Sequence, residues 1–372
     1  MKFLFVIPSF KTGGGNRVFI ELANELADTN EVYIIFPNNS NEKNTFNLSS
    51  NVNIKPIGSL ATTIAGKIWN LISCIRFINT NSQDSYLIIS DPIMVLFISF
   101  IKLKNKIRFI QADDFKIFDD KMIIKSRVGL YFYKQICKLV YRLQGKYIFN
   151  SSYTYTRYVE VSKRKDVPLH IVHPAVDHHF FFPNSCLYDE NEKVNIAIVG
   201  RKHPWKGLST FIESWNILPL ELKFKVGKVQ IISHDDLSNF KMDGFEIIQP
   251  SSDSDIANIL RNSNIFISTS WWEGFGLPPL EAMACGCSII VSDSGGVSEY
   301  AVPDLNCLMF KPKDQIGLQE AIANLVVDKN LRRKLSLNGL ETAKNFKWGK
   351  SAQQLLDIID EIEKTSKITP FY

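Results

Sequence analysis

The chain has 372 residues, which is long enough for two domains with full hydrophobic cores. Its formal net charge of +5 is too small to indicate a nucleic-acid partner, and its 45% hydrophobic and 22% charged residues are typical of a globular protein. The six cysteines lack the spacing of a disulfide framework or a zinc site. Met1-Lys2 leads straight into a strand, which argues against a signal peptide, and the longest strongly apolar run, residues 93–101, is too short to span a bilayer. We therefore expect a globular protein of the reducing cytoplasm.

The first half of the chain begins with a strand, a glycine-rich turn and a helix. Residues 3–8 predict a buried strand, Gly13-Gly14-Gly15 predicts a tight turn, and residues 16–27 show helical periodicity. This order is typical of a mononucleotide-type βα unit. Residues 38–55 are rich in Asn and Ser and predict a surface loop. The further predictions are strands at 31–36, 86–90, 107–111, 147–150 and 170–173, helices at 62–78 and 92–103, and a helix N-cap at Ser152.

Residues 121–146 contain seven Lys or Arg and no Asp or Glu. Lys134, Lys138 and Arg142 repeat every four residues, so they share one face of a predicted helix. One interpretation is a core-packed helix with a solvated basic face. The other is a peripheral surface for anionic lipid head groups on the inner face of the membrane. Both stay open.

The second half begins after a polar linker at residues 184–193. Residues 194–199 predict a strand, which is followed by Gly200-Arg201, then Lys206-Gly207 and a helix. Two basic residues in a loop are, by themselves, ordinary surface charges. The remaining predictions are strands at 229–233, 245–249 and 307–310 and helices at 314–327, 330–346 and 348–364.

The most informative stretch is residues 268–300, which follows an apolar run at 265–267. Pro278-Pro279 fits the first positions of a helix that carries Glu281 in its first turn and stops near Gly286. Residues 287–292 predict the next strand, and Gly295-Gly296 the start of another helix. Glu273 and Glu281 are therefore expected to face one crevice beyond the carboxyl ends of parallel strands. The alternative is a solvated Glu273 and a Glu281 that only complements the helix dipole.

The segment EGFGLPPLEAMACGCSIIVSD closely resembles the signature of retaining glycosyltransferases of family 4, which have the GT-B fold. The resemblance implies that Glu281 binds the ribose hydroxyls of a nucleotide. It also implies that Glu273, with the backbone of Gly274, Phe275, Gly276 and Leu277, holds the donor sugar and the diphosphate.

Three other segments resemble the same family. In PSFKTGGGNRVFIELANEL, the resemblance places Gly14 and Gly15 near the donor diphosphate. In GRKHPWKG, it makes Gly200, Arg201 and Lys206 neighbours of the leaving diphosphate, where cations stabilise the charge that develops. The turn after Ile248 would face the nucleobase. HPAVDHHFF resembles the end of the family's first domain, and we interpret its histidines as structural.

The chain departs from the family at Gln111-Ala112-Asp113-Asp114. Many relatives carry a His near this place, and this sequence has no His before His170. A branch that resembles rhamnosyltransferases has Gln-Asp instead. The resemblance thus assigns Gln111 and Asp113 to the acceptor side, with Asp113 or Asp114 as an acceptor contact and ordinary loop carboxylates as the alternative.

Together these observations predict an α/β GT-B protein with two Rossmann-like domains facing a deep cleft. We expect an acceptor-binding domain at 1–184, a nucleotide-sugar-binding domain at 185–350, and a C-terminal helix at 351–372 that returns to the first domain, with Phe371-Tyr372 packed there. The predicted function is transfer of a sugar from a nucleoside-diphosphate sugar to a glycan or lipid-linked saccharide in cell-surface polysaccharide synthesis, with no metal or cofactor. Arg201, Lys206 and Glu273 are the expected catalytic residues. A nucleotide-sugar epimerase of GT-B type and an inactive sugar-nucleotide-binding subunit remain alternatives.

Overall fold

The computed structural model describes residues 1–39, 46–116, 127–184 and 193–368, and these form two compact units. One unit runs from the N-terminus to Pro174 and takes in the chain again from Trp348 onward. The other is Ala175–Lys347. The second unit thus begins ten residues before the predicted boundary at 184, because Val176 and His178 bond there to the Phe346 carbonyl. The predicted linker, residues 184–193, lies almost wholly outside the described residues.

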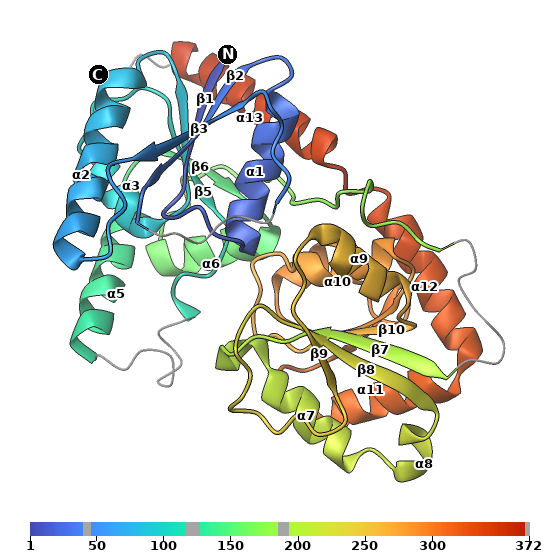
Figure 1. Cartoon of the computed structure of the whole chain (residues 1–372). Helices are drawn as coiled ribbons and strands as arrows, with labels where there is room; N and C mark the ends of the chain where they lie inside the picture. Colours follow the sequence, from blue (N-terminus) through green and yellow to red (C-terminus); the bar gives the residue numbers. More distant parts are fainter. Residues whose placement is uncertain (40–45, 117–126, 185–192, 369–372) are drawn as a thin grey trace. The chain divides into compact units, whose positions relative to one another are not determined.

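Unit 1 is built on a parallel sheet with the strand order β3-β2-β1-β4-β5-β6 (Figure 1). Its strands are β1 (Lys2–Val6), β2 (Glu31–Pro37), β3 (Val52–Ile57), β4 (Tyr86–Ile89), β5 (Lys106–Ile110) and β6 (Lys146–Phe149). Most of these are near-continuous apolar runs, as expected for parallel strands that are buried on both faces. The strand order reverses between β1 and β4, and such a switch point is where open α/β sheets bind ligands.

The helices of unit 1 cover both faces of this sheet. They are α1 (Gly14–Leu26), α2 (Ile64–Asn81), α3 (Pro92–Ser99), α5 (Arg127–Arg142), α6 (Ser152–Ser162) and α13 (Trp348–Ile368). Leu4 and Val6 of β1 share a core with α2 and α3, whereas Phe5, on the other face of the strand, packs on Phe19 of α1. The C-terminal helix α13 returns to this unit and packs against α1. The predicted position of Phe371-Tyr372 lies outside the described residues.

Unit 2 repeats the plan with the parallel strand order β12-β11-β10-β7-β8-β9. Its strands are β7 (Val194–Val199), β8 (Val226–Ile232), β9 (Glu246–Ile248), β10 (Ile265–Ser268), β11 (Ser288–Ser292) and β12 (Cys307–Phe310). Its helices are η1 (Pro204–Lys206), α7 (Leu208–Ile217), α8 (Leu220–Lys223), α9 (Asp253–Arg261), α10 (Leu277–Ala284), η2 (Gly296–Glu299), α11 (Gln315–Val327) and α12 (Lys329–Ala343). The strand order reverses between β7 and β10.

Several local predictions were wrong. Residues 52–55, the end of the predicted surface loop, belong to β3, because an exposed edge strand lacks the apolar run that marks a buried one; Pro56 is tolerated at an edge. Residues 170–173 make one isolated bridge, Phe149 to Ile171, and no strand. The N-cap of α6 is Ser151, whose side chain accepts from the Thr154 N–H, and not Ser152. Glu281 lies in the second turn of α10, because that helix begins at Leu277.

Candidate active site

In unit 2, the loops after β7 and β10 lie against each other at the switch point. Gly207 is the C-cap of η1 and has a positive φ of 69°. A Cβ built on Gly207 would lie 2.0 Å from the backbone oxygen of Thr269. Thr269 Oγ1 donates to the Lys206 carbonyl at 3.0 Å, and the Trp271 N–H donates to the Trp205 carbonyl at 2.7 Å. Only glycine allows this approach, so the GRKHPWKG segment is fixed against the loop that carries Glu273.

This contact brings Lys206 and Glu273 together. Lys206 Nζ lies 2.5 Å from Glu273 Oε1, and the two side chains are 29% and 19% exposed. Arg201 is paired as well, with its Nε 2.9 Å from Asp235 Oδ2. Both expected catalytic cations therefore sit in ion pairs that leave part of each side chain open to solvent.

Asp235 follows β8 and was not singled out from the sequence. Desolvation by burial raises the pKa of Asp235, but hydrogen bonds from the Lys202 N–H and from Arg201 outweigh it, so the pKa is lowered overall. A Ser-His-Asp stretch at the end of a predicted strand was the available signal. The carboxylate holds the Arg201 side chain in place at the rim of the site.

The backbone around Glu273 is fixed by the turn after β11. The Glu273 N–H donates to the Ser294 carbonyl at 2.8 Å, and the Gly296 N–H donates to the Glu273 carbonyl at 3.0 Å. A Cβ on Gly296 would lie 2.0 Å from the Gly274 oxygen. The glycines thus allow two backbone segments to touch, which sets the direction of the Glu273 side chain.

The other predicted donor residues lie on elements around this centre. Gly276 is the N-cap of α10 with φ of 87°, Leu277 is its first residue, and Glu281 is buried one turn further. The Phe275 ring packs against Tyr300 and Phe346, so its side chain belongs to the core. Ile248 ends β9, and its carbonyl accepts from the Ser233 N–H. Gly200 follows β7, where a Cβ would lie 2.5 Å from Ile231 Cγ2.

An aromatic stack beside the ion pair was missed in the sequence. The rings of Trp205 and Trp272 are nearly parallel with centroids 6.0 Å apart, and His203 stacks on Trp205 at 4.4 Å. Burial and the neighbouring Arg201 lower the pKa of His203, which favours the neutral form of its ring. Such rings offer flat apolar surface next to charged groups.

Unit 1 has a cavity of about 220 Å³ at its own switch point. It lies beyond the ends of β1, β4 and β5 and beside the start of α1, where Gly15 lines it and Gly14 does not. Its lining comprises Val6, Ile7, Pro8, Gly15, Asn16, Phe19, Ser90, Asp91, Pro92, Gln111, Asp114 and Tyr133.

The two predicted acceptor-side residues have different surroundings. Gln111 lines the cavity, and neither its Oε1 nor its Nε2 has a hydrogen-bond partner although both atoms are buried. Asp113, in contrast, accepts from the N–H groups of Phe115 and Lys116 at 3.0 and 3.1 Å and from Arg157 at 2.6 Å. Asp113 therefore caps a turn, whereas Gln111 is available to a ligand.

Asp114 is the carboxylate that reaches the cavity. Burial raises the pKa of Asp114 to about 6, and the Arg108 guanidinium, 3.2 Å away, only partly opposes this shift. Asp91, which caps α3, lines the same cavity, and burial raises its pKa too. The sequence analysis assigned Asp113 to the acceptor side and named Asp114 as the other possible acceptor contact, whereas the cavity is lined by Asp114 and not by Asp113.

No cluster of three or more His, Cys, Asp or Glu side chains that could hold a metal ion occurs in the part of the chain that the structure describes. Within the same residues, no helix is both long and apolar enough to cross a bilayer.

Two parallel-sheet, Rossmann-like domains define the GT-B class, and comparison with solved structures confirms that fold. Sucrose-phosphate synthase from Thermosynechococcus elongatus superposes with a TM-score of 0.80 at 16% identity, over 98% of this chain and all of that one (100%). Within this class, residues 188–342 match the family described as Glycosyl transferases group 1. The candidate site of unit 2 lies inside the matched region.

Curated relatives agree with the domain match. An uncharacterized glycosyltransferase of Methanocaldococcus jannaschii is 25% identical over 65% of this chain and 66% of its own length. The N,N'-diacetylbacillosaminyl-diphospho-undecaprenol alpha-1,3-N-acetylgalactosaminyltransferase of Campylobacter jejuni is 27% identical over 64% of this chain and 66% of its own. The chain thus spans slightly under two thirds of the length of these relatives. Both relatives belong to the glycosyltransferase class of enzymes, and they give the epimerase alternative no support.

Proposed function

We propose that the protein is a retaining glycosyltransferase of family 4. In this proposal it moves a sugar from a nucleoside-diphosphate sugar to a hydroxyl of a glycan or lipid-linked saccharide during cell-surface polysaccharide synthesis. The observation that carries the proposal is the Lys206–Glu273 pair, held at the switch point of a group 1 glycosyl transferase domain. The Campylobacter relative is named for an undecaprenol-linked saccharide, and this name supports a lipid-linked saccharide as the acceptor class.

In the proposed reaction, unit 2 binds the donor and stabilises the leaving group. Lys206 and Arg201 exchange part of their carboxylate contacts for the diphosphate, whose charge grows as the bond from the sugar C1 to the phosphate oxygen breaks. Glu273 accepts hydrogen bonds from donor sugar hydroxyls, and Glu281 accepts from the ribose. The acceptor oxygen bonds to C1 on the same face, and its proton passes to the departing phosphate oxygen, so no protein base is needed.

Unit 1 contributes the acceptor side in this proposal. The unpartnered amide of Gln111 and the carboxylate of Asp114 line one cavity and match the donors and acceptors of a sugar hydroxyl. Their positions beyond the ends of β-strands are typical of ligand sites in open parallel sheets.

Donor identity is tested by a thermal-shift screen of nucleotide sugars, with a rhamnosyl donor included because of the Gln111-Ala112-Asp113 segment. A radiolabelled form of the stabilising donor is then incubated with the protein and candidate lipid-linked acceptors. We expect labelled product with retained anomeric configuration and unchanged turnover in a chelator. Donor binding without transfer or hydrolysis would favour the inactive subunit.

Substitution of Glu281 tests the donor site directly. We expect Glu281→Ala to weaken nucleotide binding in calorimetry by about 1.5–3 kcal/mol, because hydrogen bonds to a charged group are lost. Glu320→Ala, on α11 in the same unit, serves as the control. Unchanged affinity in a folded Glu281 variant would remove this residue from the site.

A further inference from the structure

Three helices of unit 1 expose large apolar side chains to solvent. On α2 these are Ile64, Ile68, Trp69 and Ile72, with exposed fractions of 79, 53, 59 and 38%. Phe97 of α3 is 43% exposed, and Phe100, directly after that helix, is 79% exposed. On α5, Val128, Tyr131, Phe132 and Leu139 are 66, 61, 61 and 51% exposed. We refer to these ten residues as the α2–α3–α5 face.

The three helices form one layer. Cys74 and Ile78 of α2 share a hydrophobic core with Met94 and Ile98 of α3, and α3 packs directly against α5. Figure 1 shows α2, α3 and α5 along the same side of the unit. The exposed apolar side chains therefore belong to one layer, and large apolar side chains gathered on one exposed layer indicate an interaction site.

The charge of this layer has one sign. The sequences of α2, α3 and α5 contain no Asp or Glu. Exposed cations lie among the apolar side chains, namely Lys67 and Arg76 on α2, Lys102 and Lys104 after α3, and Lys138 and Arg142 on α5. In contrast, α13 in the same unit carries Asp357, Asp360, Glu361 and Glu363.

On α5, the exposed apolar residues and the cations share a single helix face. Val128, Tyr131, Phe132, Lys138 and Leu139 recur at spacings of three, four and seven residues, which places them together. Lys134, which the sequence analysis had grouped with Lys138 and Arg142, is half-buried. Of the three cations that the sequence analysis grouped, only Lys138 and Arg142 are thus exposed, and the exposed face of α5 is more apolar than expected.

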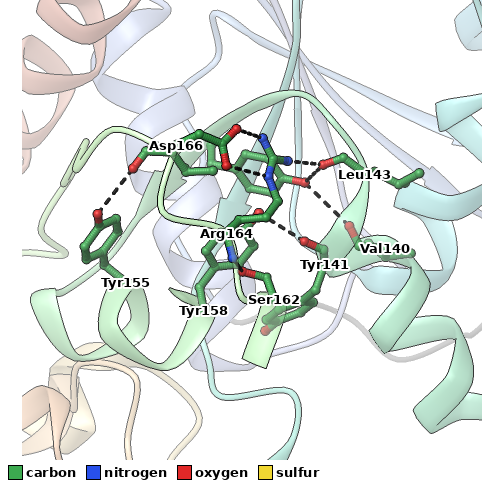
Figure 2. Close-up of polar contacts among 10 residues, drawn as sticks. Val140, Tyr141, Leu143, Tyr155, Tyr158, Ser162, Arg164 and Asp166 are labelled. Atoms are coloured by element: carbon green, nitrogen blue, oxygen red, sulfur yellow. Dashed lines mark hydrogen bonds and ion pairs between the residues drawn. The ribbon is translucent and has the colours of Figure 1, made fainter. Parts of the chain in front are cut away.

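Contacts at the end of α5 and on its buried side fix the orientation of its exposed face. Figure 2 shows the end of α5 bonded to the segment after it: the Tyr158 hydroxyl donates to the Tyr141 carbonyl at 3.1 Å, and Arg164 donates to the Leu143 carbonyl at 2.5 Å. Arg164 is itself held by Asp166. Because these contacts and the buried Cys137 and Val140 hold the inner side, the outer residues cannot turn inward.

We infer that the α2–α3–α5 face docks onto an anionic lipid bilayer. Exposed Trp, Tyr, Phe and Ile side chains interleaved with cations, without acids, are the composition of a surface that lies in the membrane interface. The apolar side chains enter the boundary between head groups and acyl chains, and the cations pair with anionic head groups. The charge of the layer is the reason to choose anionic lipid over a second copy, which would bring the same cations together. This inference names the membrane partner for the proposed lipid-linked acceptor, and its test needs no activity.

The test is sedimentation of the full chain with vesicles of phosphatidylcholine alone or mixed with phosphatidylglycerol. We expect binding to the mixed vesicles at low salt and partial release at high salt, because inserted apolar side chains are not screened. The triple variant Trp69→Ser, Phe100→Ser, Phe132→Ser should lose the part of the vesicle binding that resists high salt. The triple variant Lys67→Gln, Lys102→Gln, Lys138→Gln should bind about fivefold more weakly per removed cation.

The matched control is Leu220→Ser, Phe224→Ser, Val327→Ser, which removes equally exposed apolar residues from unit 2 and should leave binding unchanged. Circular dichroism checks that each variant is folded. The inference is overturned if the wild-type chain ignores anionic vesicles. It is also overturned if the Trp69, Phe100 and Phe132 variant binds normally, or if this variant converts a dimer to a monomer in size-exclusion chromatography. Sugar transfer to a water-soluble acceptor by a chain that ignores vesicles would leave the proposed function standing.

Discussion

The two units carry candidate sites at equivalent positions, each beyond the strand ends where the sheet order reverses, but the two differ in how their polar side chains are paired. In unit 2, Lys206 and Arg201 are already paired with Glu273 and Asp235. In unit 1, Arg108 is paired with Asp114, but the buried side-chain amide of Gln111 has no hydrogen-bond partner. Buried polar groups are rarely left unpaired, which makes the Gln111 amide a candidate ligand contact. In unit 2 the ion pairs hold both cations in place, which suits the proposed role of stabilising developing charge.

The largest expected effect is loss of turnover in unit 2. Lys206→Ala and Arg201→Ala should each lower kcat by about 10²–10³, because in the proposed reaction each removes a charge that stabilises the leaving group. The KM of the acceptor should change little. Steady-state kinetics with the donor found in the screen measures both quantities. Wild-type kcat in both variants would mean that the diphosphate is held elsewhere.

Next in size is the cost of separating the two loops of unit 2. Gly207→Ala should lower the free energy of unfolding by more than about 3 kcal/mol, because φ is positive and the new Cβ meets the Thr269 oxygen. Gly244→Ala is the matched control, since φ there is 84° and nothing lies within 4 Å. It should cost only about 1 kcal/mol. Equal losses in chemical denaturation would show that the loop contact has no role.

In unit 1, removing the unpaired amide of Gln111 should affect the reaction with the acceptor without lowering the stability of the fold. Gln111→Met should leave the free energy of unfolding unchanged or raise it by up to ~1 kcal/mol, and it should lower kcat/KM for the acceptor about tenfold. The control is Asn70→Leu, because the Asn70 amide has three acceptors and its loss should destabilise the unit by about 1–3 kcal/mol. A destabilised Gln111 variant with normal acceptor kinetics would show that the Gln111 amide serves the fold and does not contact the acceptor.

The smallest expected effect is a pH dependence of opposite sign in the two units. The pKa of Asp114 is raised from 3.8 to about 6, so the folded chain binds the proton more tightly than the unfolded chain. The stability that this proton contributes is present below about pH 4 and is lost as the pH rises through 6. The change should be about 1 kcal/mol, because a fifth of the side chain stays exposed.

The pKa of Asp235 is lowered, so its contribution should instead be lost as the pH falls below the ordinary range of a carboxyl group. Hydrogen exchange of the β5 and β8 amides across pH 3.5–7 follows the two units separately. Asp114→Asn should flatten the β5 profile, and Asp235→Asn the acid limb of the β8 profile. Profiles of the same sign in both units would show that these carboxyls do not differ as described.

Much of unit 2 was predictable because one large part of its candidate site is contiguous in the chain. Residues 265–296 contain the strand, the glycines, the start of α10 and both glutamates, and local propensity and spacing place them without long-range information. The fold class followed from alternating apolar strands and helices. The partner of Arg201 was missed because Asp235 belongs to another βα unit and only sheet order brings the two together.

For this protein, the sequence determined the fold class, the buried strands and the glycine-rich loop of residues 273–296, because these depend on local composition and spacing. The tertiary structure alone decided three features: that Asp113 caps a turn while Asp114 enters the cavity, that β3 forms an edge strand, and that the ten apolar residues of the α2–α3–α5 face are exposed. The physical reason is that hydrogen-bond partners and burial depend on which elements pack together. A helix with apolar residues on two faces does not reveal, from its sequence, which face the sheet will cover.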